Sequence, residues 1–144
     1  MSQLIVVGID SSRCCQRSVE YAAECAKTGA AKLLLVHVIE WSQFSFSTPM
    51  ENEVRHKRRE DELTRAQADL IDPVVAELKA KGLEVDWVVL HGHPAQTIAE
   101  LAEEKGASNI VVGRKGTSKL KAQLFGSVPS TLVQVSNVPV TVVP

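Results

Sequence analysis

The sequence predicts an α/β protein in which a parallel five-stranded sheet is covered by helices on both faces. Short apolar runs alternate along the chain with segments whose apolar residues recur every three or four positions, which is the order strand, helix, strand. The runs are apolar at nearly every position, as strands are when both faces of a sheet are covered. With 144 residues, of which 44% are hydrophobic, the chain can bury a core and form one domain over residues 1–144.

The five apolar runs are the expected strands. Two of them end in residues that can carry chemistry: the first run is followed by Asp10, and the fourth by Gly113 and a loop rich in glycine and lysine. Ligands of open parallel sheets lie beyond the carboxyl ends of the strands, so these two ends are expected to border a binding crevice if the strands are neighbours. The expected strands are Leu4–Ile9, Lys32–Ile39, Leu83–Leu90, Asn109–Val112 and Val138–Val143.

The helical segments are bounded by residues that start or stop helices. Ser11 and Ser12 are suited to cap the first helix, and Gly29 is placed to end it. The charge-rich segment 51–81 has the apolar spacing of one long amphipathic helix, in which Pro73 is expected to cause a kink. The remaining two helices are expected to run from Pro94 to Gly106 and from Ser127 onward.

Charge and cysteine content restrict the class of function. The net charge is −1, but residues 105–144 contain five basic and no acidic residues, whereas 11 basic and 17 acidic residues precede them. This asymmetry favours a face that binds an anion, while the overall composition is not basic enough to predict nucleic-acid binding. No apolar run is long enough to span a membrane. The three cysteines form no disulfide pattern and there is no leader-like start, so we expect a cytoplasmic protein.

The loop after the fourth strand carries the clearest motif. It reads Gly113-x2-Gly116-x9-Gly126-Ser127 and leads directly into a helix. Glycine lets backbone N–H groups approach a phosphate closely, and the N-terminus of a helix adds free N–H groups and a partial positive charge. The loop fits neither the Walker A pattern nor Gly-x-Gly-x-x-Gly. From spacing alone, it is either a phosphate-binding loop or a simple turn.

The whole chain resembles the universal stress protein family. The glycine motif after Ile-Val-Val looks like the family's ATP-binding signature, and the opening Leu-Ile-Val-Val-Gly-Ile-Asp10, the second strand with His37 and the closing Val-Pro-Val-Thr-Val-Val are similar to family segments. The resemblance implies a Rossmann-like sheet of order 3-2-1-4-5. It also implies a homodimer through Val138–Val143 and an unidentified protein partner.

Matched residue by residue, the resemblance implies a site for an adenine nucleotide, ATP or alternatively ADP or AMP, with Mg²⁺ as a candidate companion of the phosphates. Asp10 and the backbone at Gly8 and Val38 would border adenine and ribose, and Val112 and Gly113 would lie beside the ribose. The last four residues of the set would surround the phosphates. One position departs from the family pattern, because Pro129 stands where a small or hydroxyl side chain is frequent. The implied residues are Gly8, Ile9, Asp10, Val38, Val112, Gly113, Arg114, Gly116, Gly126, Ser127 and Val128.

Three functions remain open at this point. The first is a nucleotide-responsive regulator of the stress response with little or no turnover, because no nucleophile is paired with a general base in the sequence. The second is a slow ATPase or phosphotransferase. The third is an interaction protein whose nucleotide site is vestigial. The intact glycine motif argues against this third function.

Other residues have simpler interpretations. Cys14 and Cys15 are expected to pack, His91 and His93 to mark a strand end and not a metal site, and His37 to be a hydrogen-bonded core histidine. The aromatic loop at residues 41–46 is expected to be a lid beside the nucleotide, a partner surface or a segment folded onto the sheet.

Overall fold

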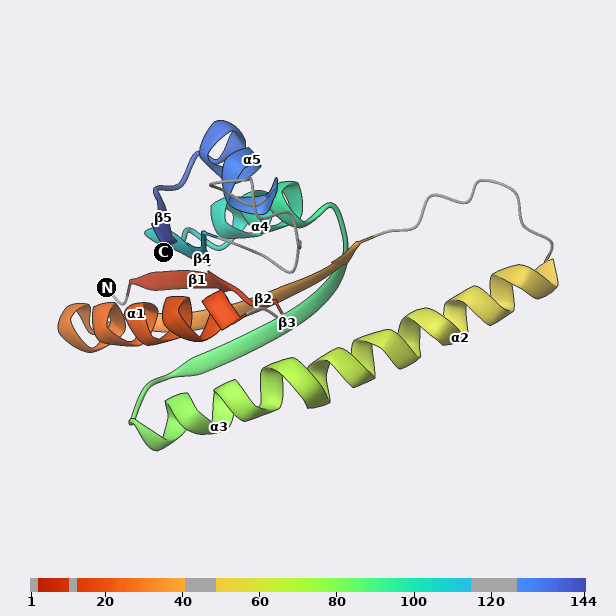
Figure 1. The fold of residues 1–144 in the computed structure, drawn as a ribbon, viewed down its shortest axis with the longest axis horizontal. Coiled ribbons are helices and arrows are strands. Elements are labelled where there is room, and N and C mark those ends of the chain that lie inside the picture. Colours follow the sequence, from red (N-terminus) through yellow and green to blue (C-terminus); the bar gives the residue numbers. More distant parts are fainter. Residues whose placement is uncertain (1–2, 11–12, 41–48, 115–126) are drawn as a thin grey trace.

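The computed structural model confirms the predicted fold and strand order. All neighbouring strands are parallel, and the sheet has the order β3-β2-β1-β4-β5 (Figure 1). The strands are β1 (Leu4–Gly8), β2 (Lys32–Glu40), β3 (Val85–Gly92), β4 (Asn109–Gly113) and β5 (Val140–Val143). The helices are α1 (Arg13–Gly29), α2 (Pro49–Ala66), α3 (Asp72–Ala80), α4 (Pro94–Glu104) and α5 (Ser127–Val135), with a π-helical turn, η1 (Gln67–Ile71), between α2 and α3.

The structure describes residues 3–10, 13–40, 49–114 and 127–144. The aromatic loop and most of the glycine loop, including Gly116 and Gly126, lie outside these residues, as do the expected caps Ser11 and Ser12. Within the described ranges, no helix is both long enough and apolar enough to cross a membrane.

Two apolar clusters fill the space on the two faces of the sheet. The first contains α1, η1 and α3, with Ile71 and Leu78 fully buried against the sheet. The second contains α4 and α5, with Ile98 at 4% exposure and Leu132 fully buried. In Figure 1, α4 and α5 accordingly lie above the sheet and α1 and α3 below it. Both faces are therefore covered, as the uniformly apolar strands predict.

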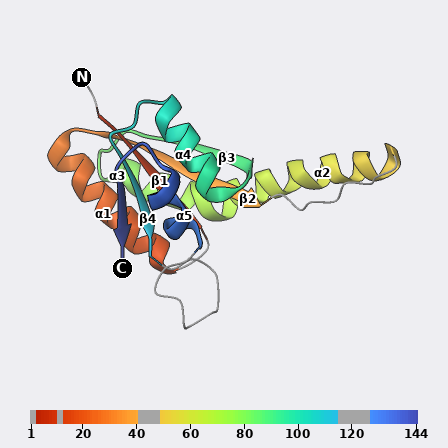
Figure 2. The same cartoon turned by 90° about the horizontal axis from the view of Figure 1, so that it is seen from above.

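The long helical segment differs from the expectation of a single kinked helix. The distortion precedes Pro73, which lies in the first turn of α3. Proline has no N–H to donate and its ring crowds the carbonyl of residue i−4, so the α-helical pattern fails there. The backbone N–H of Asp72 bonds instead to the carbonyl of Gln67, five residues earlier, which makes the turn π-helical. Figures 1 and 2 both show α2 extending beyond the edge of the sheet.

Every expected strand has at least one end that is wrong by one or two residues, and β5 starts at Val140 instead of Val138. The third strand runs from Val85 to Gly92 instead of Leu83 to Leu90, so His91 lies in the strand. The first helix includes Gly29, and the left-handed residue that ends it is Ala30, with φ of 51°. The N–H of Ala31 bonds to the carbonyl of Ala26 at 3.0 Å, which closes a Schellman-type end despite the absence of glycine at the left-handed position.

Gly8 allows the ends of β1 and β4 to pack closely. A Cβ atom on Gly8 would lie 2.9 Å from Cγ1 of Val112, whose side chain is itself 4% exposed and unable to move away easily. We therefore expect Gly8→Ala to lower the free energy of unfolding by about 1–3 kcal/mol, measured by chemical denaturation.

Gly29→Ala is the matched control. Its Cβ would come no closer than 3.6 Å to Oε1 of Gln3, an ordinary contact, and the position lies at a helix end. This variant is expected to be as stable as the parent, or more stable by about 0.4–1 kcal/mol. Equal losses in the two variants would contradict the close-packing role of Gly8.

Candidate functional site

The candidate site lies at the carboxyl ends of β1 and β4. These strands are neighbours, with Val6 opposite Ile110 and Val7 opposite Val111. The chain continues from β1 to Asp10 and from β4 to Arg114, so both segments leave the sheet at the same edge. The strand order reverses between β1 and β4, and this is the point at which open α/β sheets bind ligands.

Three valines form the apolar part of this site. Val38 at the end of β2 and Val112 at the end of β4 belong to the cluster on the α4 and α5 face, with exposures of 9% and 4%. Val128, in the first turn of α5, packs against the same cluster. Gly8 faces Val112, so the carboxyl ends of β1 and β4 are closely packed over this cluster.

Hydrogen bonds fix the chain just before Asp10. The N–H of Ile9 donates to the carbonyl of Val36 at 2.8 Å, and Nδ1 of His37 donates to the carbonyl of Ile9 at 2.6 Å. Because a carbonyl can only accept, this contact assigns the ring proton of His37 to Nδ1. The predicted hydrogen bond of His37 is confirmed, but the residue is half-buried and does not belong to the buried core. His37 reaches the carbonyl of Ile9 only because β1 pairs with β2. The sequence around His37 contains no signal that identifies Ile9 as its hydrogen-bond partner.

Ile9 and Asp10 also border an acidic groove on the opposite face of the sheet. The groove has a volume of 260 Å³ and lies between α1 and the η1–α3 segment. Besides Asp10, its walls contain the carboxylates of Asp69 and Glu77, and none of its lining residues is basic. Ile9 itself is 4% exposed and packs in the cluster on this face. An anionic ligand is therefore disfavoured on this side, and favoured on the side of β4 and α5.

Arg114, a half-buried cationic residue, directly follows β4. The backbone N–H of Arg114 donates to the carbonyl of Val143 at 2.8 Å, which extends the pairing of β4 with β5 by one residue. Among the described residues, Nε of Arg114 is a buried side-chain nitrogen without a hydrogen-bond partner. An unpaired buried donor costs about 1–3 kcal/mol, more when it is charged, so this atom suits an anionic ligand such as a phosphate.

The start of α5 packs against the cluster that contains Val112, through Val128. Ser127 is exposed, Val128 is half-buried and Pro129 is buried, so the proline is accommodated within the first turn of the helix. The backbone N–H groups at the start of a helix are free to bind an anion, although Pro129 supplies none. Of the four residues predicted to surround the phosphates, the structure thus describes Ser127 and Val128.

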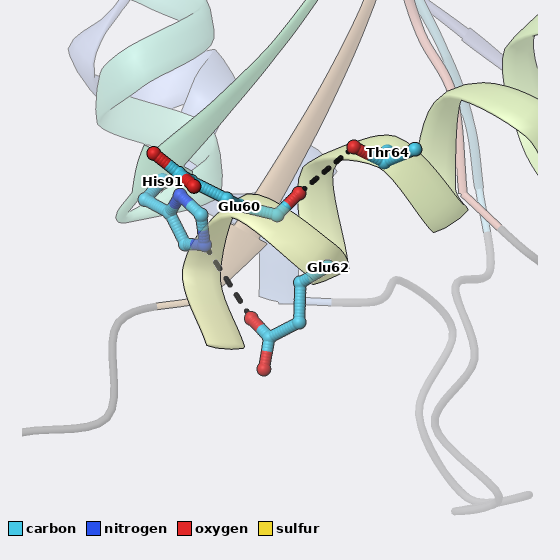
Figure 3. A network of polar contacts seen from close by, with 4 residues as sticks. All are labelled: Glu60, Glu62, Thr64 and His91. Atoms are coloured by element: carbon cyan, nitrogen blue, oxygen red, sulfur yellow. Dashed lines mark hydrogen bonds and ion pairs between the residues drawn. The ribbon is translucent and has the colours of Figure 1, made fainter. Parts of the chain in front are cut away.

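The two histidines near the end of β3 have different surroundings. Nε2 of His91 lies 3.4 Å from Oε2 of Glu62 in α2, and Figure 3 shows this contact beside the hydrogen bond from Thr64 to the carbonyl of Glu60. His93 is exposed and precedes α4. Within the described ranges, no group of three or more His, Cys, Asp or Glu could hold a metal ion.

Cys15 is buried at 8% exposure in the cluster with α1. This position agrees with the packing role expected for it. The side chain of Cys14 lies outside the part of the chain that can be described.

The fold defines a class of protein: a doubly wound α/β domain in which the strand order reverses between β1 and β4. The model of the universal stress protein family matches residues 1–144, and the chain belongs to this family. The resemblance drawn from the glycine motif and strand segments is therefore confirmed at the level of the family.

Individual relatives agree with this assignment. Universal stress protein YxiE of Bacillus subtilis is 28% identical over 152 residues, covering 99% of this chain and 99% of YxiE. The solved structure of MJ0577, a universal stress protein of Methanocaldococcus jannaschii, superposes with a TM-score of 0.83 at 28% identity, over 99% of this chain and 96% of that one. A universal stress protein in complex with cAMP has a TM-score of 0.65 at 27% identity, with coverage of 99% and 96%.

The contact between His91 and Glu62 is expected to attach α2 to the end of β3. The histidine side chain is 12% exposed and the carboxylate 44%, so solvent screens the pair only in part. In a double-mutant cycle with His91→Ala and Glu62→Ala, we expect a coupling free energy of about 0.5–1 kcal/mol from chemical denaturation.

The pair His56–Glu60 provides the control cycle. It joins the same residue types at 3.0 Å within α2, but its side chains are 76% and 65% exposed. Its coupling is expected to be smaller, about 0.3–0.5 kcal/mol or less. A His91–Glu62 coupling below that of the control would show that this contact does not hold α2 in place.

Proposed function

We propose that this protein binds an adenine nucleotide at the carboxyl edge of β1 and β4 and acts as a nucleotide-responsive regulator of the stress response. The observation that carries the proposal is the pairing of β1 with β4, which puts the segments of Asp10 and Gly113 at one edge of the sheet. The family relative in complex with cAMP supports an adenine nucleotide as the ligand class.

Each part of the nucleotide has a candidate surface. The apolar residues Val38 and Val112 suit the base and ribose, and the carboxylate of Asp10 suits a hydroxyl or amino group. Arg114 and the first turn of α5 suit the phosphates. We propose as ligands ATP, ADP or AMP, with Mg²⁺ held mainly by the phosphates and water. The proposed set comprises Gly8, Ile9, Asp10, Val38, Val112, Gly113, Arg114, Gly116, Gly126, Ser127 and Val128.

The proposal includes binding without appreciable turnover. The sequence pairs no nucleophile with a general base, and a bound nucleotide can still change which protein partner the molecule recognises in the cytoplasm. A multiple-turnover assay separates this from the enzymatic alternative, because an ATPase with typical activity turns over at about 1 s⁻¹ or faster.

Gly126→Val tests the nucleotide site directly. A branched side chain at this position of the glycine motif would occupy the space that a phosphate needs, so ATP affinity measured by calorimetry should fall at least about tenfold, equivalent to ~1.4 kcal/mol. Gly29→Val is the control, because Gly29 is the last residue of α1 and lies near the amino ends of the strands, away from the proposed site. Unchanged ATP affinity in Gly126→Val, with an intact fold by circular dichroism, would reject the proposed site.

We also propose a homodimer through Val138–Val143. β5 is an edge strand of the sheet, and the adjacent helix α5 exposes Val133 and Val135 at 59% and 50%. An apolar edge strand with unpaired backbone groups favours pairing with a second copy, and a two-fold pair is the simplest closed assembly.

Val142→Pro is expected to convert this dimer into a monomer in light scattering. The carbonyls of Pro139 and Val143 bond to β4, so by alternation the N–H of Val142 points to the free edge, and proline removes it without breaking the β4 pairing. Val142→Thr keeps both the N–H and the branched shape and should remain dimeric. A parent protein that is monomeric at micromolar concentration would contradict the proposal.

A further inference from the structure

The amino-terminal half of α2 stands apart from the sheet. Figures 1 and 2 both show this end of the helix extending beyond the other elements. The side chains of residues 56–61 are all exposed, and the first buried side chain among those described in α2 is that of Ala66, in the last turn. Most helical stability in proteins comes from packing one face against other elements, and this half of α2 has no such packing within the described chain.

The charges of α2 are sorted along its length. Residues 55–59 read Arg-His-Lys-Arg-Arg, and residues 60–62, which follow directly, read Glu-Asp-Glu. In a parallel pair of such helices, like charges would lie opposite one another. In an antiparallel pair, each basic block would lie opposite an acidic block. α2 is therefore electrostatically complementary to a second α2 that runs in the opposite direction.

One side of α2 presents this complementarity to solvent. Arg58, Asp61 and Arg65 follow one another at intervals of three and four residues, so they lie on the same side of the helix. Together with Lys57 and Glu62 they line a groove of 460 Å³. Arg58, Asp61 and Arg65 are exposed, and their side chains have no ion-pair or hydrogen-bond partner among the described residues. Their charges are available to another molecule.

We propose that α2 binds α2 of a second copy of this chain, antiparallel, about a two-fold axis that passes between Arg59 and Glu60. This register puts Arg58 of each copy opposite Asp61 of the other. A guanidinium can bind a carboxylate through two parallel hydrogen bonds, which gives the contact a defined geometry as well as charge. The same patch is used on both copies, so the contact closes after two copies.

An anionic partner of another kind fits α2 less well. A polyanion such as nucleic acid, attracted by residues 55–59, would be repelled by the carboxylates of residues 60–62 in the adjoining turn. A second α2 satisfies both blocks. The same register also puts Lys57 opposite Glu62, whose side chain is 44% exposed.

The contact is separate from the dimer proposed through Val138–Val143. α2 contacts β3 through Glu62 and His91, whereas β5 forms the other edge of the sheet. Pairing of α2 would therefore join two such dimers, or two single chains if β5 does not pair. All five residues that line the groove are charged, so the association depends on ion pairs, which salt screens within about 10 Å at 0.1 M.

Exchange of the charges tests the pairing by sedimentation velocity. We expect the mean mass of the parent to rise with protein concentration up to about 1 mM in about 20 mM NaCl, and this rise to disappear in about 0.5 M NaCl. Arg58→Asp and Asp61→Arg should each weaken the association at least about tenfold, because each puts like charges opposite one another. An equimolar mixture of the two variants should associate as the parent does, since each variant supplies the charge that the other lacks.

The mixture separates pairing between copies from an ion pair within one helix, which mixing cannot restore. Lys79→Asp is the matched control, because Lys79 is exposed on α3 and its substitution changes the net charge as Arg58→Asp does. It should leave the association unchanged.

Three results would overturn the inference. They are a mixture that stays as dissociated as its components, a parent whose mass depends on neither salt nor concentration, and loss of association in Arg58→Asp but not in Asp61→Arg, which would show that the basic block meets a different acidic surface. If a single variant does not fold by circular dichroism, the double variant Arg58→Asp/Asp61→Arg decides. It should associate with itself and not with the parent, and free mixing with the parent would reject the register.

Discussion

β1 lies at the centre of the sheet with β2 on one side and β4 on the other, and the rest of the molecule is arranged around this position. Crossovers between parallel strands are right-handed. The connection from β1 to β2 therefore puts α1 on one face, and the connection from β3 back to β4 puts α4 on the other. The two connections leave the sheet in opposite directions, and the edge between β1 and β4 stays open to a ligand.

The two faces of the sheet contribute different kinds of side chain to the candidate site. The ends of β2 and β4 contribute Val38 and Val112 to the α4 and α5 face, and Arg114, whose Nε is buried, directly follows β4. The carboxylates of Asp69 and Glu77 lie on the α1 and α3 face. Gly8 permits this arrangement, since any larger residue would separate the ends of β1 and β4 at Val112. Apolar contact, positive charge and close backbone approach thus come together at one edge.

Much of this organisation could be predicted from the sequence, because apolar runs, glycine and proline act locally. Other features depend on tertiary contacts. Ala30 adopts the left-handed conformation next to Gly29, and Pro73 produces a π-helical turn upstream instead of a simple kink. The contact of His37 with the carbonyl of Ile9 and the burial of Nε of Arg114 arise only when distant segments pair. Neither has a local sequence signal.

The central claim, that an adenine nucleotide binds where β1 and β4 meet, is tested most directly by titrating AMP into ¹⁵N-labelled protein and following backbone amide shifts by NMR. The largest changes are expected at Asp10, Gly113 and Ser127. The amides of Lys32 and Glu84, which lie at the amino ends of β2 and β3, should be unaffected. Changes concentrated at Lys32 and Glu84, or no saturable change at Asp10 and Gly113, would contradict the account.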